Sequence, residues 1–221
     1  MPPRPGRCAP GDPERRGGAL RRAPYVSKPL LGIGLVALAA CSSMMPRPQA
    51  LPYPPQRIFQ NAYSFMPPGE LGWLVLARDA HQLAFARQGG NPNETYGIQG
   101  RLFRLPAHGS SEEFVQIIRQ GLAAEAGEKR FRILKHDVSA DTSQQTSCAR
   151  SHFVAEDSAA VKRTATPGSM ILEAMTLSCA HPKNRDFAVT LVYSHRYYPG
   201  QADPSFAEKA ARLLSSLEFL E

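Results

Sequence analysis

The uneven distribution of proline is the feature of this sequence that most limits its fold. Fourteen of the twenty prolines lie within residues 1–68, and the remaining 153 residues contain only six. Proline lacks a backbone N–H and has a fixed φ, so it interrupts helices and the interior of sheets. We therefore expect a proline-rich tether over residues 41–70 and a single globular domain over residues 71–221.

Apolar residues beyond the tether recur with the periods of strands and helices. Seven segments have strand-like patterns: residues 73–77, 83–87, 96–105, 131–138, 146–156, 169–180 and 187–197. Two segments have helical spacing, each beginning with a predicted capping box: residues 110–127 and 205–217. Each helix has one apolar stripe, which predicts packing against a sheet.

These elements predict an α+β fold, a single domain in which a twisted antiparallel sheet is packed by two helices. The order expected is β-β-α-β-β-β-β-α, which counts two strands before the first helix. This order is similar to that of the PsbP-like fold. The resemblance covers roughly residues 71–221 and implies that both helices lie on one twisted sheet.

A short apolar run precedes Cys41 and follows a basic stretch. The run, residues 30–40, would rise about 16 Å as a helix, too little to cross a hydrocarbon core of about 30 Å. Its length is typical of a signal peptide, and Leu38-Ala39-Ala40-Cys41 resembles the lipobox of bacterial lipoproteins. The resemblance implies removal of residues 1–40, followed by acylation of Cys41 on its thiol and on its new amino group.

The residue after the cysteine bears on the location of such a lipoprotein. In enteric-type lipoproteins an Asp at this position marks retention in the inner membrane, whereas this chain has Ser42. The resemblance therefore implies an anchor in the outer membrane, with the domain facing the periplasm. Residues before Val26 do not look like the start of a signal peptide, and we expect translation to begin at Val26.

The formal charge of +7 is concentrated in the segment that we expect to be removed. Residues 1–40 contain seven Lys or Arg and two acidic residues, so the rest of the chain has nineteen basic and seventeen acidic residues. A nearly balanced mature chain gives no indication of a nucleic-acid partner. The partners expected are the membrane, through the lipid anchor, and a protein of the cell envelope.

Cys148 and Cys179 are the cysteines that remain in the predicted domain. If residues 146–156 and 169–180 form a hairpin, the two lie opposite each other, which predicts a disulfide in an oxidising compartment. A zinc site with His152 and His181 is the alternative. Cys148 and His152 would be about 13 Å apart along a strand, too far to share one ion, so no metal is predicted.

The densest polar and aromatic cluster follows Tyr193. Alternation places Tyr193, His195 and Tyr197 on one face of the last strand, and Ser194 and Arg196 on the other. We consider His195, Arg196 and Tyr198 as candidate ligand-binding residues, because Arg196 could recognise a carboxylate or phosphate. The alternative is a structural strand end, with packed aromatic rings and a solvated or paired Arg196.

No phosphate loop, nucleophile elbow or metalloprotease motif occurs in the sequence, and no cofactor or catalytic residue is predicted. The segments Cys179-Ala180-His181-Pro182 and Val192-Tyr193-Ser194-His195-Arg196 resemble uncharacterised lipoproteins of proteobacteria, which implies a class but no chemistry. The hypothesis favoured is a non-enzymatic binding or assembly module on a lipid anchor. The alternative is a small periplasmic hydrolase or ligand-sensing domain that uses His195 and Arg196.

Overall fold

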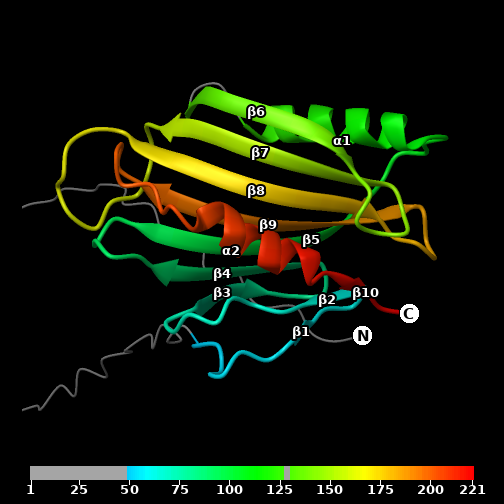
Figure 1. The fold of residues 1–221 in the computed structure, drawn as a ribbon, viewed down its shortest axis with the longest axis horizontal. Helices are drawn as coiled ribbons and strands as arrows, with labels where there is room; N and C mark the ends of the chain where they lie inside the picture. Colours follow the sequence, from blue (N-terminus) through cyan, green and yellow to red (C-terminus); the bar gives the residue numbers. More distant parts are fainter. Residues whose placement is uncertain (1–48, 127–129) are drawn as a thin grey trace, which may run out of the picture. The chain divides into compact units, whose positions relative to one another are not determined.

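The structure, a computed structural model, describes residues 49–126 and 130–221. Its centre is a seven-stranded antiparallel sheet in the order β3-β4-β5-β9-β8-β7-β6 (Figure 1). The strands are β3 Leu74–Arg78, β4 Gln82–Gln88, β5 Thr95–Arg104, β6 Phe131–Asp141, β7 Cys148–Asp157, β8 Met170–Ala180 and β9 Phe187–Tyr197. With α1 Ser111–Glu125 and α2 Phe206–Ser215, they confirm the predicted α+β class.

The expected element order lacked several strands. All three strand-like segments before α1 form strands, β3 to β5, although the order counted two. A second, three-stranded sheet has the order β1-β2-β10, formed by Ile58–Phe59, Tyr63–Phe65 and Glu218–Phe219. Strands of two or three residues are too short to show alternation, so their sequences gave no strand signal.

A tether was predicted over residues 41–70, but the structure shows folded chain from residue 49 onward. Tyr63 and Phe65 of β2 are almost fully buried in the main core, and residues 49–51 lie along β3. The N–H of Leu51 donates to the carbonyl of Trp73 (2.9 Å), and the N–H of Val75 donates to that of Gln49 (2.7 Å). The prolines flank the short strands, so they interrupt regular structure without preventing burial. The domain therefore begins by residue 49.

The two helices pack on opposite faces of the large sheet, and Figure 1 views the face covered by α2. Phe206, Ala210, Leu213 and Leu214 of α2 share one buried cluster with the odd-numbered residues of β9, such as Leu191. Ala188 of β9 belongs instead to a cluster with Phe114, Val115 and Ile118 of α1. Successive side chains of a strand point to opposite faces, so the sheet has a core on each side.

Of the two predicted side-chain caps, the structure confirms the one at α1 and contradicts the one at α2. Ser110 accepts a hydrogen bond from the N–H of Glu113 at the start of α1, as expected of an N-cap. Ser205 makes no side-chain cap at α2. Instead, the Asp203 carboxylate accepts hydrogen bonds from the N–H (2.9 Å) and hydroxyl (2.7 Å) of Ser205. The Asp203 side chain thus holds the residue that precedes α2, and the predicted side-chain cap of Ser205 is absent.

The β7–β8 hairpin has the register expected from the cysteines. Cys148 lies directly opposite Cys179, and a disulfide joins them across 31 residues of sequence. Both side chains are buried in the core under α2. The disulfide therefore links two central strands inside the domain.

Gly100 of β5 marks a close approach between the two sheets. A Cβ at this position would lie 2.3 Å from the hydroxyl oxygen of Tyr63 in β2, a distance that carbon and oxygen do not tolerate without a shift. Glycine thus lets the small sheet pack directly against the large one. In the part of the chain that the structure describes, no helix is long and apolar enough to span a bilayer.

Candidate functional site

His195 lies on the α2 face of β9 and is fully buried. Its ring stacks on Tyr96, with centroids 4.3 Å apart, and on Tyr197, at 4.5 Å. Its Nε2 lies 2.8 Å from a carboxylate oxygen of Glu94. Burial lowers the pKa of His195 more than the Glu94 carboxylate raises it, so the imidazole is held in its neutral form.

Glu94 is occupied by structural contacts as well. It accepts hydrogen bonds from His195 and from the N–H groups of Gly90 (2.6 Å) and Asn91 (3.3 Å) in the β4–β5 loop. Burial opposes ionisation of Glu94, but these donors outweigh it and hold the pKa of the carboxyl below its usual value. The pair therefore fixes a loop to the end of β9.

Arg196 points to the opposite face of β9, as the alternation predicted, and pairs there with Asp157. Asp157 of β7 has a fully buried side chain, 3.0 Å from Arg196, and accepts two hydrogen bonds from Arg130 at 2.9 and 2.8 Å. Burial raises the pKa of Asp157, but the Arg130 hydrogen bonds and the Arg196 charge outweigh it and lower the pKa overall. Arg196 therefore pairs with a carboxylate inside the domain, which is the structural alternative stated for it above.

Tyr198, the third candidate residue, contributes to a loop contact. Its hydroxyl accepts a hydrogen bond (3.0 Å) from the side-chain amide of Asn93, which is buried. The side-chain oxygen (Oδ1) of Asn93 accepts hydrogen bonds from the backbone N–H groups of Arg163 (2.7 Å) and Thr164 (3.0 Å). Asn93 therefore joins the β4–β5 loop to the β7–β8 loop, a role that no sequence motif indicated.

The three candidate residues do not converge on one pocket. His195 and Arg196 use separate carboxylates on opposite faces, and Tyr198 belongs to a loop contact. In residues 49–126 and 130–221, no three His, Cys, Asp or Glu side chains come together as a metal site would require. His152, from the alternative zinc set, instead lies 2.8 Å from Glu173.

A groove between α1 and the large sheet is the stronger candidate site. The helix packs mainly on β6 and β7, at the far side of the sheet from β4, and a hollow remains between the helix and β4 and β5. The hollow has a volume of about 470 Å³. Its apolar lining comes from α1, β4, β5 and β9: Ala84, Phe103, Ile117, Leu122 and Val192.

Four polar side chains of the groove form two pairs with one another. The hydroxyls of Ser178 and Thr190 on its floor lie 2.7 Å apart and share a hydrogen bond. Arg101 of β5 and Glu125 of α1 form an ion pair of 2.5 Å between the two walls, with both side chains about half exposed. Most of the lining is apolar, and the charged pair is half exposed, so the groove suits apolar side chains with a polar group at the rim.

Gly121 makes the groove wider where α1 lines it. A Cβ at this position would meet nothing within 4 Å, so no packing constraint requires glycine. We expect Gly121→Ala to raise the free energy of unfolding by about 1 kcal/mol, because glycine destabilises helix interiors. Urea denaturation of both proteins measures this. An unchanged or lower stability would mean that this stretch of helix is constrained by its glycine.

The comparisons with known proteins do not identify a family for this chain. No protein-family model matches the chain, and no curated protein matches it. A solved structure of a mutant of Protein Mog1 is similar, with a TM-score of 0.43 and 11% sequence identity. The match covers 76% of this chain and 96% of that chain.

Proposed function

We propose that the chain is a lipid-anchored lipoprotein of the cell envelope that acts as a non-enzymatic binding module. In this proposal Cys41, which lies outside the described residues, carries the acyl chains in the outer membrane. The groove between α1 and the sheet holds an apolar segment of an envelope protein. The resemblance of residues 38–41 to a lipobox supports the anchor, and the groove supports the binding role.

The open, apolar groove is the single observation that carries the binding function. Its volume accommodates several side chains, and both of its walls are regular elements, which hold a binding surface rigidly. Its lining is mainly apolar, which favours an apolar occupant over a sugar or an ionic metabolite. Partner side chains that enter such a pocket are the usual anchors of a protein interface.

Filling the groove tests this function. Gly121→Trp would place an indole in the hollow, whereas Gln120→Trp puts the same ring on a neighbouring position of α1 that does not line it. In pull-downs from detergent-solubilised envelope, we expect wild type and Gln120→Trp to retain the same stoichiometric partner. Gly121→Trp should retain about tenfold less, a loss of about 1.4 kcal/mol in binding.

Two results of this experiment would contradict the proposed function. If Gly121→Trp and Gln120→Trp recover the partner equally, the groove is not its binding site. If wild type recovers no partner in stoichiometric amount, the binding function itself is wrong. Thermal unfolding of each variant shows whether a loss of partner reflects a loss of fold.

A further inference from the structure

Large apolar side chains are exposed close to the point where the described chain begins. Tyr53, Phe59, Leu71 and Leu76 are each between 57% and 67% exposed. Few large apolar residues elsewhere in the described chain are so exposed. A soluble domain seldom leaves neighbouring aromatic and leucine side chains in water without a use for them.

The four side chains belong to one continuous surface, here called the N-terminal face. Phe59 and Leu76 line one hollow, and Tyr53 and Leu71 line the next. Leu51 and Pro52 line both hollows, so the two adjoin. This continuity distinguishes the face from apolar residues that are exposed singly.

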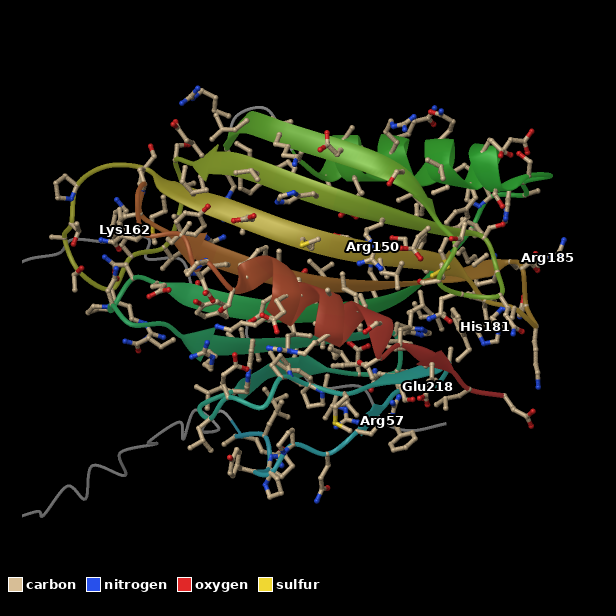
Figure 2. The ribbon with its side chains drawn as sticks, in the orientation of Figure 1. Arg57, Arg150, Lys162, His181, Arg185 and Glu218 are labelled. Carbon is tan, nitrogen blue, oxygen red and sulfur yellow. A yellow bond between two sulfur atoms is a disulfide. The ribbon has the colours of Figure 1, made fainter. Side chains whose placement is uncertain are left out.

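The N-terminal face is held together by hydrogen bonds between β1 and β3. The Arg78 guanidinium donates to the carbonyl of Phe59 (2.8 Å) and to the side chain of Gln60 (3.2 Å). The Gln60 amide donates in return to the carbonyl of Asp79 (2.6 Å). Arg57, on the same surface, pairs with Glu218 of β10 (Figure 2). These contacts fix the exposed side chains relative to the sheet.

The length of chain between the predicted anchor and the domain limits where this face can lie. Gln49, whose carbonyl is bonded to β3, is eight residues beyond Cys41. Eight residues span at most about 29 Å when fully extended. With lipid on Cys41, the β3 edge therefore stays within that distance of the bilayer, and the N-terminal face is the surface that begins there.

We propose that the N-terminal face lies on the phospholipid bilayer that holds the anchor, with Tyr53, Phe59, Leu71 and Leu76 at the level of the headgroups. This inference rests on the proposed lipidation of Cys41. Aromatic and leucine side chains favour the interface between headgroups and acyl chains, and a second contact of this kind strengthens a lipid anchor. The opposite edge strand, β6, then faces away from the membrane.

Quenching by brominated phospholipids tests the orientation. The lipidated protein is reconstituted into vesicles of phosphatidylethanolamine and phosphatidylglycerol, with added tryptophans at exposed positions. Leu76→Trp and Phe59→Trp report on the N-terminal face, and Leu134→Trp, at a 49% exposed position of β6, is the matched control. The native Trp73 is buried, so the unmodified chain gives the background.

We expect brominated lipid to remove about half of the added emission at positions 59 and 76, and none at position 134. Equal quenching at positions 59, 76 and 134 in vesicle-bound protein would overturn the orientation while leaving the anchor intact. A second copy of the chain would be the occupant of this face under a different set of results. Positions 59 and 76 would then not be quenched, and the Cys41→Ser chain would form dimers that Leu76→Glu dissociates. If the chain does not remain on vesicles and mass spectrometry finds no lipid on Cys41, the proposed lipidation is contradicted instead.

Discussion

Breaking the disulfide between Cys148 and Cys179 is expected to lower the free energy of unfolding by about 3–4 kcal/mol. The bond closes a loop of 31 residues, so its removal gives the unfolded chain more conformations. Both cysteines are buried in the core between the sheet and α2, so the loss affects the whole domain. The measurement is urea denaturation of the oxidised protein against the Cys148→Ala/Cys179→Ala double variant.

Reductant supplies the control for this prediction. It should destabilise the wild type by a similar amount and leave the double variant unchanged, because that variant has no disulfide to reduce. A loss below about 1 kcal/mol would mean that the unfolded β7–β8 segment is already restricted without the bond.

Replacing Asp157 with asparagine is expected to cost about 3–5 kcal/mol of stability. Its side chain is fully buried between Arg196 and Arg130, and Arg196 is itself largely covered. Asparagine keeps the shape but leaves the arginine charges without a carboxylate. Asp137→Asn is the matched control, since Asp137 forms an exposed pair with Lys135, for which about 0–1 kcal/mol is expected.

The pH dependence of the free energy of unfolding is a second test of the role of Asp157. The pKa of Asp157 is lower in the folded chain than in the unfolded chain, so the unfolded state binds its proton first as the pH falls. Its stabilising contribution is therefore present above about pH 4 and lost below it. Asp157→Asn should show a weaker loss of stability in this range. If the free energy of unfolding fell equally steeply with decreasing pH in the wild type and in Asp157→Asn, the stabilising role of the Asp157 carboxylate would be contradicted.

The large sheet could be predicted because its strands are long enough to show alternation. β9 illustrates this: its sequence placed His195 and Arg196 on opposite faces, and in the structure His195 stacks on Phe206 of α2 whereas Arg196 pairs with Asp157 on the other face. The pairing of Cys148 with Cys179 followed from the register of one hairpin. Local periodicity was sufficient in these cases, because neighbouring segments pair with each other.

The partners of the polar side chains could not be predicted in this way. Glu94, which pairs with His195, lies 101 residues away in sequence, and only the contact between β5 and β9 brings the two together. The groove was missed for a related reason. Residues such as Thr190 and Val192 have the same pattern whether their face is open to water or lies beside α1.

The tether shows how composition misleads when elements are very short. Proline density predicted a tether over residues 41–70, but the eleven residues between Pro55 and Pro67 are enough for two short strands. Tyr63 and Phe65 then become core residues. The consequence is functional, because a domain that begins by residue 49 leaves a much shorter link to the predicted anchor.

The state of Cys41 is the central claim, and mass spectrometry of the protein isolated from the membranes of its host tests it most directly. The account predicts a mature chain whose first residue is Cys41, with a diacylglyceryl group on its sulfur and an acyl chain on its amino group. A chain that retains residues before Cys41, or that begins there with an unmodified thiol, would contradict it.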